Sequence, residues 1–99
     1  METSAVQDQI KQCLVRDFKP VFVEVTNDSA RHHGHLEAPS GVSGSHFRIQ
    51  MASEVFSGSS LIQRHQAVYR SLENFFKTGV HALQMELLSV EEWHARRTV

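Results

Sequence analysis

The sequence predicts an α+β fold in which a three-stranded sheet carries helices on one face. Two observations predict it. Apolar residues recur at three- and four-residue steps in two long segments, the period of a helix face, and three shorter segments are β-branched or alternate apolar with polar residues. The segments follow in the order α-β-β-α-β-α, which suits two packed layers. A chain of 99 residues can close one modest core, so we expect a single domain over residues 1–99.

The first helix is expected over residues 4–18. Thr3 or Ser4 is available as its N-cap, and Pro20 follows closely enough to stop it. One face of this helix is apolar and carries Val6, Ile10, Cys13, Leu14 and Phe18.

Two strands are expected next, over residues 21–26 and 46–51. The first is β-branched and the second alternates polar with apolar residues. Between them, residues 27–45 form a long loop rich in Gly, Ser and His. A connection of this length within a small domain is usually functional or flexible.

A second helix is expected after the turn at residues 57–60 and should end near Gly79, a residue typical of helix C-termini. Its apolar stripe comprises Leu61, His65, Val68, Leu72 and Phe75 or Phe76. Residues 81–88 predict a third strand, which the helical crossover allows to run parallel to the second. Ser89 and Glu92 then form a capping box for a short last helix carrying Trp93. The strand order stays open.

Composition narrows the classes of function. The formal net charge of −1 provides no long-range attraction for nucleic acid or a membrane surface, whereas seven histidines are unusual for 99 residues. The single cysteine, Cys13, excludes an internal disulfide and a C-x-x-C knuckle and fits a reducing compartment. No apolar run approaches the roughly 18 residues of a membrane span, and the first residues are unlike a targeting peptide. We therefore expect an intracellular, cytoplasmic protein, with the mitochondrial matrix as the alternative.

His81 is the foremost candidate ligand. It opens the third strand on the same face as Leu83 and Met85, so its ring is held at an exposed strand end with one nitrogen reachable. A histidine there can equally serve only to hydrogen-bond a backbone carbonyl. His32, His33 and His35 share the long loop, and imidazole suits zinc, copper and iron. A solvated polar loop explains these three residues equally well.

The remaining candidates give no catalytic centre. Cys13 shares the apolar face of the first helix and is expected to be buried, and no Ser-His-Asp order, paired carboxylates or phosphate-binding glycine loop is present. We therefore expect a protein that is not an enzyme. Arg64, Arg96 and Arg97 are the candidate groups for binding a partner's anion. The other histidines are expected to be structural or exposed: His65 half-buried in packing, His46 at the surface and His94 in solvent.

Two motifs resemble the signature of the BolA family. The first runs from Phe56-Ser-Gly58 through Arg64-His65 to Tyr69, and the second is Val80-His81-Ala82-Leu83. The segment from Asn27 to His35, closing at Ser45-His46-Phe47, is similar to the family's variable loop in its histidine-bearing form. The resemblance extends over residues 6–93. One departure is Gln66, where the family usually has a second basic residue.

The resemblance implies a fold similar to the type II K-homology domain and a shared [2Fe-2S] cluster. By position in the family, His81 is one cluster ligand and His32, three residues beyond Ser29, is the second, with His35 as the alternative. The partner implied is a monothiol glutaredoxin, whose cysteine and bound glutathione supply the thiolates. The isolated chain is then expected to be a monomer without cofactor, acting in iron–sulfur cluster assembly or delivery or in iron regulation.

The alternative function is a nucleic-acid-binding transcriptional regulator, since type II K-homology folds bind single strands. Such domains clamp the backbone with a G-x-x-G loop. The corresponding turn, Ser57-Gly58-Ser59-Ser60, has neither a second glycine nor a basic residue. We therefore expect nucleic-acid binding to be possible but weak.

Overall fold

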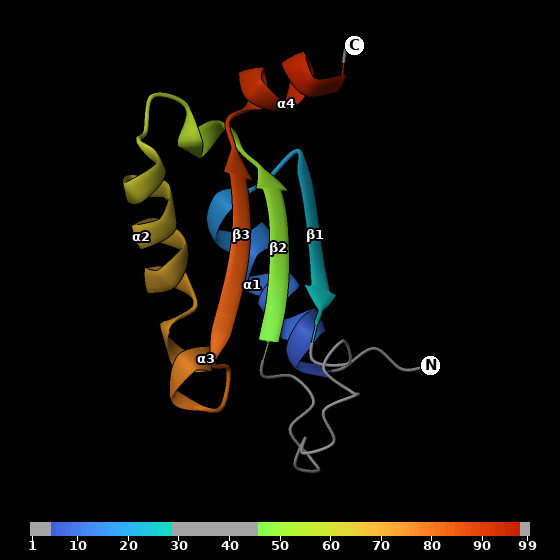
Figure 1. The fold of residues 1–99 in the computed structure, drawn as a ribbon, viewed down its shortest axis with the longest axis vertical. Coiled ribbons are helices and arrows are strands. Elements are labelled where there is room, and N and C mark those ends of the chain that lie inside the picture. Colours follow the sequence, from blue (N-terminus) through green and yellow to red (C-terminus); the bar gives the residue numbers. More distant parts are fainter. Residues whose placement is uncertain (1–4, 29–45, 98–99) are drawn as a thin grey trace.

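The computed structural model describes residues 5–28 and 46–97 and confirms the predicted α+β class. Within them the elements follow in the predicted order (Figure 1). They are α1 (Ala5–Phe18), β1 (Phe22–Asn27), β2 (His46–Ala52), the short 3-10 helix η2 (Glu54–Phe56), α2 (Leu61–Ser71), α3 (Glu73–Lys77), β3 (Ala82–Leu88) and α4 (Val90–Arg97). Among the described helices, none is long and apolar enough to cross a membrane.

The three strands form one sheet in the order β1-β2-β3. β1 pairs with β2 antiparallel, with Val25 opposite Ile49, and β2 pairs with β3 parallel, with Ile49 opposite Met85. The helical crossover from β2 to β3 makes the parallel pairing possible, as the sequence predicted. The order itself, which the sequence left open, places β2 at the centre.

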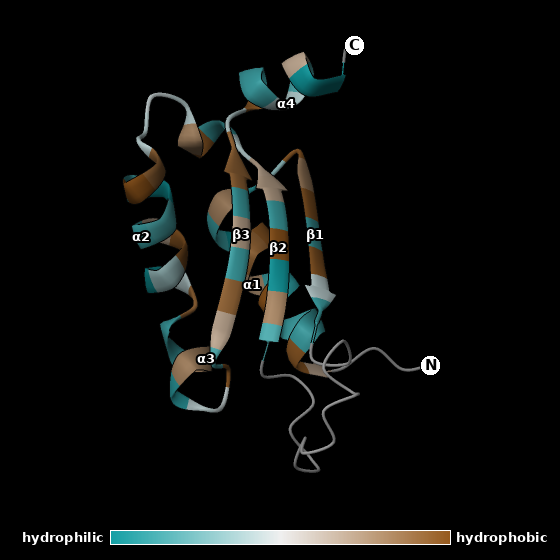
Figure 2. Ribbon diagram, viewed as in Figure 1, coloured by the Kyte–Doolittle hydropathy of each residue, from teal (hydrophilic) through white to brown (hydrophobic). Residues whose placement is uncertain are grey.

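One face of the sheet is covered by α1 and α2, and the other is open (Figure 1). Alternation along the strands produces this division, because successive side chains point to opposite faces (Figure 2). The covered face and its helices form a core that includes Ile10, Leu14, Phe18, Val25, Phe47, Ile49, Met51, Phe56, Val68, Leu72, Val80 and Leu87.

The end of α1 is set by its local chain geometry. Lys19 adopts a positive φ of 43°, which breaks the helix before Pro20. The buried hydroxyl of Ser53 donates a 2.7 Å hydrogen bond to the carbonyl of Phe18, which the helix itself leaves without a partner. The proposed N-caps of α1, Thr3 and Ser4, lie outside the described residues.

The second helix differs from its prediction in two respects. It does not run unbroken to Gly79 but is interrupted at Leu72, so that α2 and α3 are separate. Its buried line is Arg64, Val68 and Leu72, whereas Leu61 is 65% exposed. The predicted stripe was wrong at its start, where the buried residue of the first turn is Arg64 and not Leu61.

Candidate functional site

Three chain segments meet at one edge of the sheet. β1 ends there at Asn27, opposite Phe47, while β2 begins at His46, opposite Ala82 at the start of β3. The backbone N–H of Asp28 donates a 2.8 Å hydrogen bond to the carbonyl of His46. This edge follows from the pairing directions, because an antiparallel strand ends where its neighbour begins and parallel strands begin together.

His81 lies immediately before β3 at this edge, and its side chain is exposed. The backbone on its N-terminal side is held firmly. Gly79 turns the chain out of α3 with a φ of 126°, Val80 is 5% exposed, and the Val80 N–H donates a 3.0 Å hydrogen bond to the carbonyl of Phe75. The ring therefore extends into solvent from a chain segment that is fixed on both sides. β3 begins one residue later than predicted, at Ala82.

His46 lies beside His81. Their ring centroids are 6.4 Å apart and the ring planes meet edge to face at 84°. The sequence analysis treated His46 as a surface residue without a role and missed this pairing. The signal was present, because each histidine stands at or just before the start of a strand. Only the parallel register of β2 and β3 brings the two starts together.

The loop candidates His32, His33 and His35 lie outside the described residues. Among the residues that are described, no group of three or more His, Cys, Asp or Glu side chains could hold a metal ion. The described part of this edge thus offers two imidazoles.

Arg64 is not the exposed anion-binding group that the sequence analysis predicted. Its side chain is 7% exposed, and its guanidinium donates to Glu92 Oε1 at 2.8 Å, to the carbonyl of Leu87 at 2.9 Å and to the carbonyl of Ser59 at 3.0 Å. The prediction was wrong because these three acceptors, from the turn before α2, from β3 and from α4, draw the side chain inward.

Glu92 is held by the same contacts. Its carboxylate accepts hydrogen bonds from Arg64 and from the Ser89 N–H, and the Ser89 hydroxyl accepts from the Glu92 N–H. The predicted capping box is therefore confirmed. The hydrogen bond from Arg64, followed by that from Ser89, lowers the pKa of Glu92 to about 2.

Arg96 and Arg97 are exposed but contact the chain. Arg96 forms an ion pair with Glu86, and its hydrogen bond is the main cause of the lowered pKa of that carboxyl group. The Arg97 guanidinium lies 5.2 Å from the centre of the Trp93 ring. Trp93 in turn stacks on Phe22 at 4.3 Å. These arginines stand on α4, at the opposite end of β3 from His81 (Figure 1).

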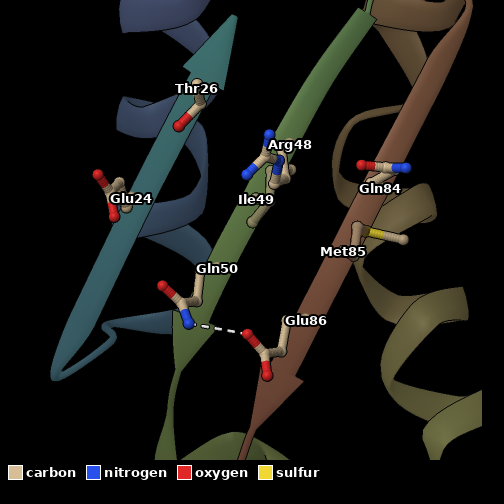
Figure 3. Close-up of a pocket in the computed structure, with 8 residues that line it drawn as sticks. All are labelled: Glu24, Thr26, Arg48, Ile49, Gln50, Gln84, Met85 and Glu86. Carbon is tan, nitrogen blue, oxygen red and sulfur yellow. Dashed lines mark hydrogen bonds between the residues drawn. The ribbon is translucent and has the colours of Figure 1, made fainter. Parts of the chain in front are cut away.

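The open face of the sheet bears a pocket between its two ends, hereafter the groove, and Figure 3 shows the residues that line it. It is lined mainly by polar side chains: Glu24, Thr26, Arg48, Gln50, Gln84 and Glu86, with Ile49 and Met85. Gln50 donates a 2.8 Å hydrogen bond to Glu86 across the strands, and Arg48 pairs with Asp28 at 3.2 Å. The groove thus gives a hydrogen-bonding surface that the sequence analysis did not identify.

The remaining predictions on single residues can be compared with their burial. Cys13 is 9% exposed, as expected, and its sulfur lies 3.4 Å from the carbonyl oxygen of Ser71. His65 is half-buried and His94 is exposed, also as expected. In the turn before α2, Gly58 has a φ of 77° and Ser60 caps the helix reciprocally with Gln63.

Comparison of the amino-acid sequence with known proteins identifies relatives of this chain. A family model described as "BolA-like protein" matches residues 14–92. The chain is 35% identical over 88 residues to the "DNA-binding transcriptional regulator BolA" of Escherichia coli, covering 89% of this chain and 79% of that protein. It is also 35% identical over 80 residues to "SufE-like protein 1, chloroplastic/mitochondrial" of Arabidopsis thaliana, covering 78% of this chain and 22% of that protein.

Solved structures of similar proteins have the same fold. The BolA domain of SufE1 from Arabidopsis thaliana superposes with a TM-score of 0.80 at 30% identity, covering 92% of this chain and 99% of the domain. BolA1 from Mus musculus gives a TM-score of 0.79 at 28% identity, covering 98% of this chain and 75% of that structure.

Proposed function

The chain belongs to the BolA-like family, and from that premise we propose that it is a non-enzymatic partner of a monothiol glutaredoxin that shares a [2Fe-2S] cluster through histidines. The observation that carries the proposal is the exposed His81 ring on a fixed backbone, at the edge of the sheet to which the histidine-bearing segment is joined. The protein would act in iron–sulfur cluster assembly or delivery, or in iron regulation.

The donor set of the chain fits a shared cluster rather than one held alone. Imidazole is a suitable iron ligand, and His81 presents one at the surface. The only thiol, Cys13, is buried against Ser71. The glutaredoxin cysteine and glutathione would therefore supply the sulfur ligands. In mixed clusters, histidine in place of cysteine on one iron raises the reduction potential.

The small number of residues between Asp28 and His32 supports His32 as the second ligand. His32 is four residues beyond Asp28, and four residues of extended chain reach at most about 14 Å. His35, seven residues beyond Asp28, reaches at most about 25 Å and is the alternative. Since Asp28 bonds to His46 at the same edge as His81, both reaches include the region of the His81 ring.

The partner surface we propose includes Arg96 and Arg97 but not Arg64, whose guanidinium is used inside the chain. Arg96 and Arg97 are exposed and stand one strand length from His81, roughly 20 Å at about 3.3 Å per residue. A partner that contacts both His81 and the two arginines of α4 would lie along β3. Such a complex also requires a reducing compartment, because the glutaredoxin thiol and glutathione must stay reduced.

The proposal is tested by mixing the chain with a monothiol glutaredoxin, glutathione and an iron–sulfur source. We expect a heterodimer on gel filtration whose visible absorption and circular dichroism differ from those of the glutaredoxin alone. Glutaredoxin treated in the same way without the chain is the control. If the two visible spectra were identical, the chain would not be contributing ligands.

Replacement of the loop histidines tests the second ligand. We expect His32→Ala to weaken the cluster complex partially, because His35 can reach the same iron, and replacement of His32, His33 and His35 together to weaken it by roughly 10–100-fold or more, at least the effect of losing an outer-shell partner. The measurement is retention of the visible dichroism during titration with an iron chelator. Unchanged retention in the triple variant would exclude a ligand from this loop.

Nucleic-acid binding is the second candidate function, because relatives 33–35% identical to this chain are named DNA-binding transcriptional regulators. The turn at residues 57–60 lacks basic residues and Arg64 is internal, so few phosphate contacts are available. We expect dissociation constants no tighter than about 10⁻⁶ M at physiological salt, as for non-specific binding. Fluorescence anisotropy with labelled DNA at several salt concentrations measures this. A sequence-specific, sub-micromolar complex that is lost in Arg70→Ala would favour the regulator function instead.

A further inference from the structure

We propose that His46 and His81 together form a two-histidine site that binds a divalent transition-metal ion, namely Zn²⁺. The chain would bind this ion on its own, in the absence of a glutaredoxin. The carrying observation is the separation of 6.4 Å between the two ring centroids at the shared edge of β2 and β3.

The distance between the two ring centroids is close to the distance expected for two imidazoles that bind one ion. A zinc–nitrogen bond of about 2.0–2.1 Å plus the radius of an imidazole ring places each centroid roughly 3.2 Å from the metal. Two rings on one ion then have centroids up to roughly 6.4 Å apart, and roughly 5 Å at a tetrahedral angle. The observed pair must close by about 1 Å to reach that geometry, which a rotation of the exposed His81 side chain supplies.

The backbone brings the two histidines close together before any ion binds. His46 begins β2 and is in register with Ala82, the first residue of β3, and His81 is the residue just before it, so the pairing of β2 with β3 sets where both histidines lie. Bringing two ligands together ahead of binding reduces the entropy lost when the metal arrives. Water can complete the coordination, because the His81 side is open to solvent.

The local charges permit a cation. Asp28 lies at the same edge, where its N–H bonds to the carbonyl of His46 and its carboxylate pairs with Arg48 at 3.2 Å. This ion pair balances its own charge and leaves no excess positive charge from these two residues at the edge. A zinc ion here would occupy the His81 ring and so compete with cluster sharing. That consequence rests on the proposed function, whereas the site itself does not.

The test is a calorimetric titration of the chain alone with Zn²⁺. The chain carries no histidine tag, and His32, His33 and His35 are replaced by asparagine. We expect one ion per chain and at least about tenfold weaker binding in His46→Gln and in His81→Gln, the lower end of what even an outer-shell loss costs. His94→Gln, which removes an exposed histidine of α4, is the matched control and should bind as before.

Nuclear magnetic resonance with Cu²⁺ keeps the test valid if His46→Gln is poorly folded. In the background chain we expect paramagnetic broadening of the amides at the start of β2 and β3, around Phe47 and Ala82. Equal Zn²⁺ affinity in the folded His46→Gln chain, or broadening centred elsewhere, would overturn the site. Because no glutaredoxin is present, this failure would be distinct from a failure of cluster sharing.

Discussion

His81→Ala should abolish the visible circular dichroism of the cluster complex with glutaredoxin while leaving the fold intact. The fold should survive because the His81 side chain is exposed, and surface substitutions usually change stability by no more than about 0.5 kcal/mol. The cluster should be lost because His81 is the ligand whose backbone is already fixed, by Val80 in the core and by the Val80–Phe75 hydrogen bond. A ligand on a fixed backbone loses little entropy on binding.

The measurement is the visible dichroism of wild-type and variant complexes reconstituted side by side, with far-ultraviolet dichroism to confirm the fold. His94→Ala is the control, because it removes an exposed imidazole from the other end of the sheet. A wild-type visible spectrum from the His81→Ala complex would show that this residue is not a ligand.

Arg64→Met should destabilise the protein by about 2–3 kcal/mol, the upper part of the range of about 1.5–3 kcal/mol for hydrogen bonds to a charged group. The substitution keeps an unbranched side chain in the core but leaves the carbonyls of Ser59 and Leu87 and the carboxylate of Glu92 without their donor. The loss should fall below that for a fully buried ion pair because the Glu92 side chain is 49% exposed.

Thermal unfolding measures this effect. For a domain of this size, about 2–3 kcal/mol corresponds to a fall in the melting temperature of roughly 10–20 °C. Arg70→Met, an exposed substitution in the same helix, is the matched control and should leave the melting temperature nearly unchanged. If the two variants melted alike, the internal role of Arg64 would be refuted.

The acid dependence of the same pair follows from the pKa of Glu92. That pKa is about 2 in the folded chain against 4.5 for the ordinary group, so the pair stabilises the fold fully above pH 4.5 and loses its contribution as the pH falls toward 2. The difference in melting temperature between wild type and Glu92→Gln should therefore be largest near pH 7 and smaller at pH 3. An equal difference at both pH values would contradict the assignment.

Local sequence patterns predicted the elements well where one residue controls the backbone. Ser60 and the Ser89–Glu92 box start α2 and α4 where the sequence placed them, because a capping side chain bonds backbone groups only three residues away. The break at Leu72 was missed, since Leu72 continues the apolar spacing of Val68 and Phe75 or Phe76, and no glycine or proline marks the interruption.

In the candidate site, too, local patterns predicted one residue correctly and missed the contacts of another. His81 was identified from its place at a strand end and from the family resemblance, and the structure places it exposed at that strand end. Arg64 was misjudged because its partners, Leu87 and Glu92, lie 23 and 28 residues away in sequence. A helical stripe reports which side of the helix is apolar, but it does not report which acceptors the rest of the fold brings to that side.

The sequence by itself determined the element order, the covered and open faces of the sheet and the presence of an exposed histidine at the start of the third strand. These depend on periodicity and on capping, which act over a few residues. Only the tertiary structure decided that β2 lies between β1 and β3, that His46 stands beside His81 and that Arg64 turns inward to Glu92. The physical reason is that strand pairing and burial join groups distant along the chain, and the register of one parallel pair sets which of them meet.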